Sequence, residues 1–196
     1  SDDHHVYVTA AVDDAIAVFE RNVDSGNAAN SGRVTQIQVV DGIPGLDRAM
    51  EIAVSNDSTD THGSRHVYVT GHTADALSVF ERNVEAASDD FGKLTLVQSF
   101  TDGVGGADGL NGARAVAVSP DGKNVYVAAE DSDSVAVFAR EATGGTLVWV
   151  EAAFDGENGW AVGPAEPGAS REAEDAMDMR ALFDVLEREV VPLFFD

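Results

Sequence analysis

A unit of about sixty residues occurs three times in this chain, and this repetition limits the fold more than any other feature. The tripeptide Val-Tyr-Val stands at 6–8, 67–69 and 125–127. A second apolar segment follows each copy, and an Asp precedes that segment: Asp14, Asp75 and Asp133. Alternating branched and aromatic residues fit a pleated strand, so both segments are predicted to be β-strands.

Two further strands complete the unit. One lies near 33–40, 93–100 and 146–150, and each copy ends close to an Asp-Gly pair. The other precedes Val-Tyr-Val at 50–55 and 114–119 but is missing before Val6. In the third copy Ser119-Pro-Asp-Gly122 predicts a type I turn between strands.

Four strands in about sixty residues are typical of a β-propeller blade. We therefore predict a mainly β fold, an incomplete β-propeller of about three four-stranded blades, the first lacking a strand. Such an arc leaves two edge strands open. The chain is thus expected to be a fragment, or to need further blades or self-association to cover its edges.

Segments 67–70, 102–110 and 113–122 resemble the YVTN-type repeats of the seven-bladed, lactonase-like β-propellers. The resemblance covers residues 1 to about 148. It implies that innermost strands such as 115–118 line a central channel. It also implies that the loop before such a strand faces the binding side, so Asp108, Asn111 and Arg114 are the candidate ligand contacts.

A tail with a different pattern follows the third repeat. We place blade repeats near 6–48, 49–111 and 112–151 in a domain of 1–148, and a tail of different origin at 149–196. A Pro/Gly-rich linker at 164–170 leads to apolar residues at helical spacing, which predict a C-terminal amphipathic α-helix. These are Ala176, Met179, Phe183, Leu186 and Val190.

Segments 149–163 and 181–196 resemble the C-terminal region of bacterial α-glucan phosphorylases. In that family an upstream lysine in a Gly/Thr/Met-rich motif holds pyridoxal phosphate. Here the only lysines are Lys93 and Lys123, and neither lies in such a motif, so we expect no cofactor. Two resemblances that meet near 147–151 indicate a chimera. A natural fusion or a recombination event would account for it, but we favour an artificial or accidental join.

Two polar clusters have features of a metal site. His62 and His66 have the i,i+4 spacing of two ligands, with His72 close by, but they are expected in a solvated surface loop. Asp131 and Asp133, with Glu130, lack the calcium-loop pattern and are expected to form a turn in which Asp side chains bond backbone amides. We therefore predict no metal site.

The composition of the chain limits the kinds of partner that it can bind. The net charge is −23, from 35 acidic and 12 basic residues. Such a surface is a poor match for nucleic acid, whose phosphates need Lys and Arg. No apolar run approaches the ~18–20 residues that would insert into a membrane. The acidity fits high salt or a cation-rich exterior, so an extracellular or periplasmic location is predicted, although no signal peptide is visible.

No Ser-His-Asp arrangement or Gly-x-Ser-x-Gly motif can be defined, and the absence of cysteine excludes a thiol nucleophile. The primary prediction is therefore a non-catalytic binding or scaffolding module from an exported acidic protein, with an unknown ligand or protein as partner. One alternative is a sugar-lactone hydrolase of the lactonase-like family. A second is a non-functional phosphorylase remnant fused to a propeller.

Overall fold

The computed structural model describes residues 4–24, 26, 30–55, 65–141 and 146–155. The predicted C-terminal helix, the linker before it and His62 lie outside these residues. None of the described helices is long and apolar enough to cross a membrane.

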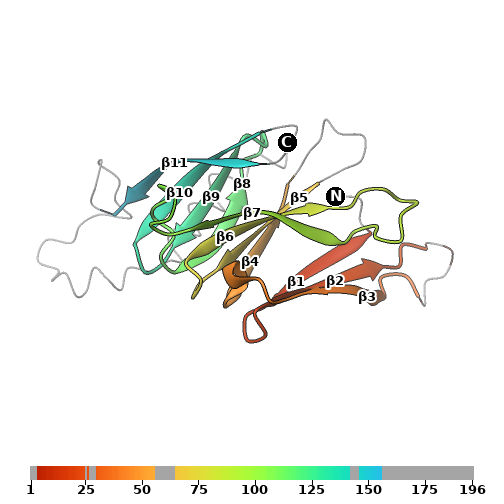
Figure 1. Ribbon diagram of the computed structural model, residues 1–196. Helices are drawn as coiled ribbons and strands as arrows, with labels where there is room; N and C mark the ends of the chain where they lie inside the picture. Colours follow the sequence, from red (N-terminus) through yellow and green to blue (C-terminus); the bar gives the residue numbers. More distant parts are fainter. Residues whose placement is uncertain (1–3, 25, 27–29, 56–64, 142–145, 156–196) are drawn as a thin grey trace, which may run out of the picture.

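Three antiparallel sheets lie side by side in the described part of the chain (Figure 1). The first contains β1 (His5–Ala10), β2 (Ala15–Arg21) and β3 (Val34–Val40). The second contains β4 (Ala49–Val54), β5 (His66–Gly71), β6 (Ala76–Arg82) and β7 (Leu94–Thr101). The third contains β8 (Ala113–Val118), β9 (Asn124–Ala129), β10 (Ser134–Arg140) and β11 (Leu147–Phe154). A 3-10 turn, η1 (Pro44–Leu46), leads into β4.

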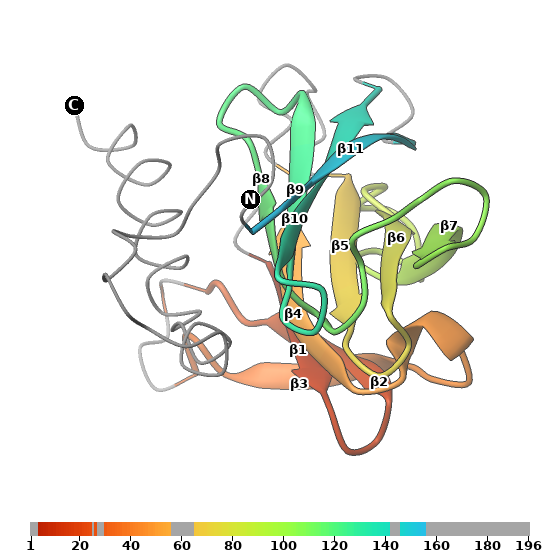
Figure 2. The same ribbon diagram turned by 90° about the vertical axis from the view of Figure 1, so that its left-hand side faces the viewer.

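Within each sheet, strands that follow one another in the sequence pair with each other. Strands β4 and β8 open their sheets and contact each other, and β1 contacts β4, so the three follow one another along the arc (Figure 2). Among the described residues, the first sheet has no strand that corresponds to β4 and β8. The predicted incomplete propeller, with three blades and a shortened first blade, is confirmed.

The aspartate that directly precedes β2, β6 and β10 has a structural role. Asp14, Asp75 and Asp133 have φ angles of 51°, 50° and 47°, a left-handed conformation that Asp tolerates better than most residues. The carboxylate of Asp14 accepts a hydrogen bond from the Arg48 amide at 2.8 Å, and that of Asp75 accepts one from the Gly112 amide at 2.8 Å. Each of these two turns is therefore tied to the loop that begins the next sheet.

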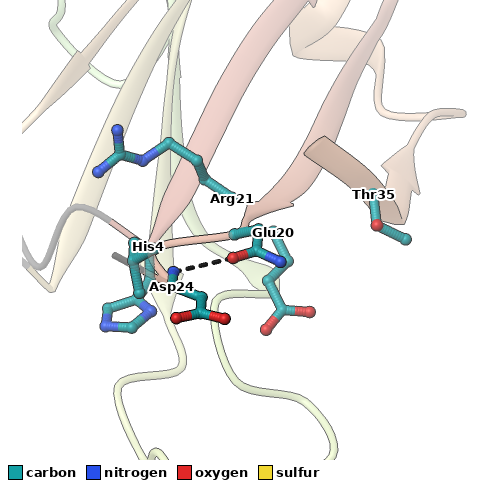
Figure 3. Close-up of a pocket in the computed structure, with 7 residues that line it drawn as sticks. His4, Glu20, Arg21, Asp24 and Thr35 are labelled. Carbon is teal, nitrogen blue, oxygen red and sulfur yellow. Dashed lines mark hydrogen bonds between the residues drawn. The ribbon is translucent and has the colours of Figure 1, made fainter. Parts of the chain in front are cut away.

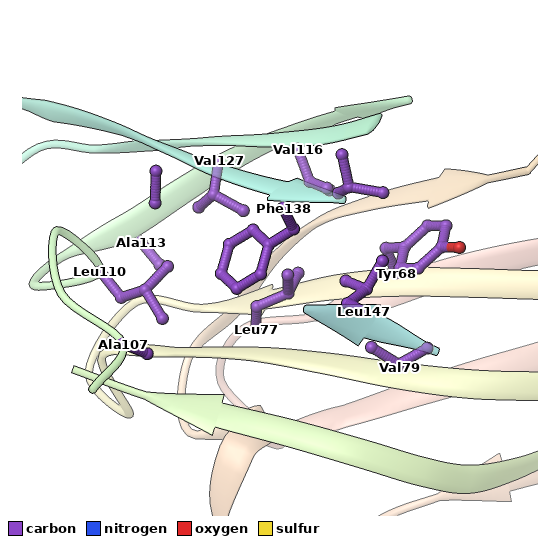
Figure 4. Close-up of a cluster of buried hydrophobic side chains, with 12 residues drawn as sticks. Tyr68, Leu77, Val79, Ala107, Leu110, Ala113, Val116, Val127, Phe138 and Leu147 are labelled. Carbon is purple, nitrogen blue, oxygen red and sulfur yellow. The ribbon is translucent and has the colours of Figure 1, made fainter. Parts of the chain in front are cut away.

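Two hydrophobic cores hold the sheets together, one at each junction. The core between the second and third sheets includes Tyr68, Leu77, Leu110 and Phe138 (Figure 4). The core between the first and second sheets includes Ile16, Leu46, Val67, Val69 and Phe80. Strand β5 contributes to both cores, because its side chains alternate between its two faces.

The outer faces of the arc are more exposed than the faces at the junctions. Val67 and Val69 are fully buried, whereas the corresponding Val6 and Val8 are 36% and 45% exposed. Tyr68 is fully buried, and Tyr126 in the third sheet is half-buried. The repeated motif is thus covered only where another sheet lies beside it.

A glutamine in the outer strand of each of the first two sheets binds the next sheet through its amide. Gln38 donates from Nε2 to the Leu94 carbonyl at 2.9 Å and accepts from the Leu94 amide at 2.7 Å. Gln98 makes the same two bonds to Leu147, both at 2.9 Å. The strand register gives Glu151 as the corresponding residue of the third sheet.

Candidate functional site

Two ionisable residues stand at the same corner of successive sheets. His72 directly follows β5, and Glu130 directly follows β9. The amide of His72 donates to the Arg48 carbonyl, and the amide of Glu130 donates to the Gly112 carbonyl, each at 3.0 Å. Equivalent backbone bonds therefore fix both residues beside the loop that begins the inner strand of their own sheet.

Arg114 reaches this corner from a β-bulge. Ala113 pairs with Ala129, and Ala115 pairs with Ala128, so Arg114 is the extra residue between two paired ones. A bulge bends the strand and redirects a side chain. The Arg114 guanidinium forms a hydrogen bond and ion pair with the Glu130 carboxylate. His72 Nε2 lies 3.7 Å from the same carboxylate oxygen. Three side chains from two sheets therefore meet at one point.

The charges in this cluster complement each other. The hydrogen bond from Arg114 is the main reason that the pKa of Glu130 is lowered, and it outweighs burial, which acts in the opposite direction. Glu130 is therefore ionised at neutral pH. The side chains of Arg114 and Glu130 are 42% and 40% exposed and that of His72 is 15% exposed, so a small molecule can reach the cluster from solvent.

The loop before Arg114 needs glycine. Gly112 has a φ of 70°, and a Cβ built there would lie 2.7 Å from the backbone nitrogen of Asp131. The Asn111 carbonyl accepts hydrogen bonds from the amides of Asp131 and Ser132, each at 3.2 Å. This close approach joins the loop before Arg114 to the turn after Glu130, and so holds the backbones of the two residues close together.

The three predicted ligand contacts have different surroundings. Arg114 lies in the cluster. Asn111 is exposed, and its carbonyl anchors the turn beside Glu130. The Asp108 carboxylate accepts from the Gly109 amide of its own loop at 2.9 Å, and the Asp108 carbonyl accepts from Nε1 of Trp149, on β11, at 3.2 Å. Their contact with a ligand remains a prediction.

The expectation of surface histidines is wrong for His66. This residue belongs to β5 and is 4% exposed, and its Nδ1 lies 3.2 Å from an Arg140 guanidinium nitrogen. Arg140 Nε also donates to the Tyr68 hydroxyl at 2.7 Å. The period-two pattern of β5 explains the error, because His66 and Tyr68 both point toward the third sheet. Among the described residues, no group of three or more His, Asp or Glu is arranged to hold a metal ion.

His72 and Glu130 were not predicted as a pair, although the repeat held a signal for them. The position after the Val-Tyr-Val strand is Ala11 in the first repeat, His72 in the second and Glu130 in the third. The bulge position is Met50 in the second and Arg114 in the third. Val-Tyr-Val and the Asp before the following strand recur in all three repeats, whereas these corner positions do not. Divergence inside a repeated unit marks positions that the fold itself does not require.

A surface pocket of about 450 Å³ lies on the first sheet, where β1 begins and β2 ends (Figure 3). This is the opposite end of the strands from the corner that holds His72 and Glu130 in the other two sheets. Its lining includes His4, Glu20 and Arg21. The second sheet has a matching pocket of about 260 Å³ lined by Arg65, Glu81 and Arg82. In each, an Asn side chain accepts from the amide two residues later: Asn22 from Asp24, and Asn83 from Glu85. Recurrence with these local turn bonds identifies a structural corner of the repeat.

A family model described as a lactonase with a seven-bladed β-propeller matches residues 1–163. This match extends beyond residue 148, and β11 continues to Phe154. A comparison with curated proteins gave no match.

Among solved structures, a periplasmic gluconolactonase of Pseudomonas aeruginosa is 25% identical, with a TM-score of 0.58, and the match covers 78% of this chain and 37% of that one. A candidate 6-phosphogluconolactonase of Bacteroides fragilis is 19% identical, with a TM-score of 0.58 and coverage of 77% and 36%. One from Bacteroides uniformis is 19% identical, with a TM-score of 0.59 and coverage of 77% and 37%. The chain thus spans little more than a third of these structures.

Proposed function

Because the chain belongs to the lactonase family of seven-bladed β-propellers, we propose that His72, Arg114 and Glu130 form part of a site that hydrolyses a sugar lactone. The observation that carries the proposal is their convergence at repeat positions that elsewhere hold Ala11 and Met50. The family match and the gluconolactonase neighbour support this alternative better than a non-catalytic scaffold.

Each group has a role that follows from its chemistry. The His72 imidazole acts as general base on a water molecule. Glu130, held ionised by Arg114, lies 3.7 Å from His72 Nε2 and stabilises the imidazolium as it forms. Arg114 has five N–H groups, so those not bonded to Glu130 can donate to the lactone carbonyl oxygen and stabilise the oxyanion.

The reaction balances without a further reagent. Water adds to the lactone carbonyl carbon, and its proton passes to His72. The tetrahedral intermediate then breaks the bond between the acyl carbon and the ring oxygen. His72 returns the proton to that oxygen, and the product is an open-chain hydroxy acid. Neither a metal nor an oxidant takes part in this sequence.

The direct test is hydrolysis of glucono-δ-lactone by the purified chain, followed by acid release in weak buffer and corrected for the spontaneous rate. We expect His72→Ala and Arg114→Ala each to lower kcat/KM by roughly 10²-fold or more. Asp89→Ala is the control, because Asp89 is an exposed carboxylate in the loop between β6 and β7, and it should retain the rate.

Absence of hydrolysis above the spontaneous rate would contradict the proposal, as would full activity of His72→Ala. Binding of the lactone or of gluconate without turnover, lost in Arg114→Ala, would instead support the binding-module reading. Isothermal titration with gluconate separates these two results.

Two properties of the whole protein are part of this proposal. Further blades or a second copy cover the open faces that carry Val6, Val8 and Tyr126, and sedimentation at increasing concentration would reveal self-association. The protein is exported, as its net charge of −23 and the periplasmic neighbour suggest. Fractionation of cells that express the full reading frame tests the location.

A further inference from the structure

Strand β8, which carries Arg114, has a paired strand on only one side in the described sheet, because the order is β11-β10-β9-β8. On that paired side the bulge leaves Arg114 without a register partner. Its backbone therefore needs other contacts to hold one orientation.

Two side chains of the second sheet supply such contacts. Thr70 Oγ1, on β5, donates to the Arg114 carbonyl at 3.1 Å. A Glu51 carboxylate oxygen, on β4, accepts from the Val116 amide at 2.8 Å. The two residues are also joined to each other, because the Glu51 amide donates to Thr70 Oγ1 at 3.1 Å. The second sheet therefore holds the backbone of β8 at the Arg114 carbonyl and at the amide two residues later.

Comparison of the two junctions shows which of these bonds recurs in the repeat and which occurs only beside Arg114. At the first junction Thr9 Oγ1 donates to the Met50 carbonyl at 2.8 Å, and Met50 occupies the position of Arg114. The threonine bond is therefore found at both junctions. The carboxylate is not repeated in the same way, because Ala115 of the third sheet stands at the position of Glu51.

We propose that Thr70 and Glu51 act as a clamp that positions the Arg114 side chain against Glu130. The proposal rests on the function proposed above for Arg114. Both clamp residues are positioning residues, because they touch the backbone of β8 and their bonds do not involve the guanidinium. Losing either bond lets the bulge reorient, and small displacements of a catalytic group cause large losses of rate.

The chain provides its own control for this test. Thr70→Val and Thr9→Val remove the same bond from equivalent positions, but only Thr70 lies behind Arg114. We expect Thr70→Val to lower kcat for glucono-δ-lactone by roughly tenfold or more, whereas Thr9→Val should leave kcat unchanged. Thr70→Ser keeps the hydroxyl and should restore most of the rate. Glu51→Leu should act in the same direction as Thr70→Val.

A second measurement does not depend on turnover. The pKa of Glu130, followed by NMR of its labelled side-chain carboxyl, is held down mainly by Arg114. It should rise in Thr70→Val and Glu51→Leu and stay unchanged in Thr9→Val. If the chain does not hydrolyse lactones but the pKa changes as expected, the clamp stands and the proposed function fails.

Three results would overturn the clamp. One is an unchanged pKa of Glu130 in folded Thr70→Val. Another is an equal loss of kcat in Thr9→Val, which would show a general effect on the fold. The third is a failure of Thr70→Ser to restore what Thr70→Val loses. Circular dichroism spectra establish that each variant is folded before these comparisons.

Discussion

His72 Nε2 and Glu130 Oε2 lie 3.7 Å apart, although the two residues occupy the same position in successive repeats. Each residue directly follows the Val-Tyr-Val strand of its own sheet. At this corner the side chain of one repeat contacts the side chain at the same position of the next repeat. Arg114 joins them from the bulge of β8. A repeated architecture can thus bring unlike groups together by changing one position in two copies.

Removing Arg114 should change the titration of Glu130. We expect Arg114→Ala to raise the pKa of Glu130 toward its ordinary value of 4.5, because the hydrogen bond that lowers it is lost. A group with a lowered pKa in the folded state stabilises the fold above its unfolded pKa, and this contribution disappears as pH falls through the folded pKa. Unfolding by urea at pH values from neutrality to below 4.5 should therefore show a smaller acid loss in Arg114→Ala. An unchanged NMR titration of Glu130 would contradict the ion pair.

The glutamine bonds between sheets can be tested by replacing Gln98 with glutamate, the residue that the third sheet has at this position. Gln98→Glu removes the donor that binds the Leu147 carbonyl and places a negative charge beside that carbonyl. We expect the free energy of unfolding to fall by about 1–3 kcal/mol. Gln36→Glu in β3 is the control, because Gln36 is exposed and its substitution should cost less than about 0.5 kcal/mol. Equal effects at the two sites would argue against the inter-sheet bond.

Glycine at position 112 should be required for its space as well as for its φ angle. Gly112→Ala and Gly103→Ala both place a side chain at positive φ, 70° and 69°. A Cβ at Gly112 meets the Asp131 backbone, whereas one at Gly103 meets nothing within 4 Å. Thermal unfolding should therefore show the larger loss for Gly112→Ala, with Gly103→Ala limited to roughly 1 kcal/mol. Lactone hydrolysis should also fall only in Gly112→Ala, since that loop precedes Arg114.

The buried tyrosine of the repeated motif should matter only where a sheet covers it. Tyr68→Phe leaves Arg140 Nε without the phenol oxygen that it binds at 2.7 Å. Because Arg140 is charged and buried, we expect a loss of about 1.5–3 kcal/mol in the free energy of unfolding. Tyr126→Phe, at the half-buried equivalent position, should cost much less. Urea unfolding followed by tryptophan fluorescence measures both, and similar losses would refute the role of Arg140.

Much of the fold was predictable, because the repeat reports the same structure three times. The strands around Val-Tyr-Val, the missing first strand and the turn closed by the Gly122 amide on the Ser119 carbonyl at 2.8 Å follow from local patterns. The aspartate before β2, β6 and β10 is visible in the sequence as a recurrence, and the structure supplies its reason. All three have a left-handed conformation, and the carboxylates of Asp14 and Asp75 bind the loop that begins the next sheet.

The candidate site was predictable only in part. The sequence predicts Arg114 from its loop, but it predicts a surface position for His72 and a turn position for Glu130. The reason is physical: their contact depends on how two sheets pack, and no pattern within one sheet reports that geometry. The β-bulge that turns Arg114 toward Glu130 is likewise a property of the pairing between β8 and β9. The chimera inferred near 147–151 stays a prediction.

The glutamine bonds give the arc a direction. The first and second sheets each bind the backbone of the following sheet through a glutamine side chain, and the second sheet therefore takes part in both kinds of contact. A duplicated unit of this kind carries both the glutamine and the leucine backbone that form the contact between sheets. Another copy can therefore be added to the arc without a matching change elsewhere. The third sheet has Glu151 in place of the glutamine. An ionised carboxylate can accept a hydrogen bond from a backbone amide of a following sheet, but it cannot donate one to a backbone carbonyl of that sheet.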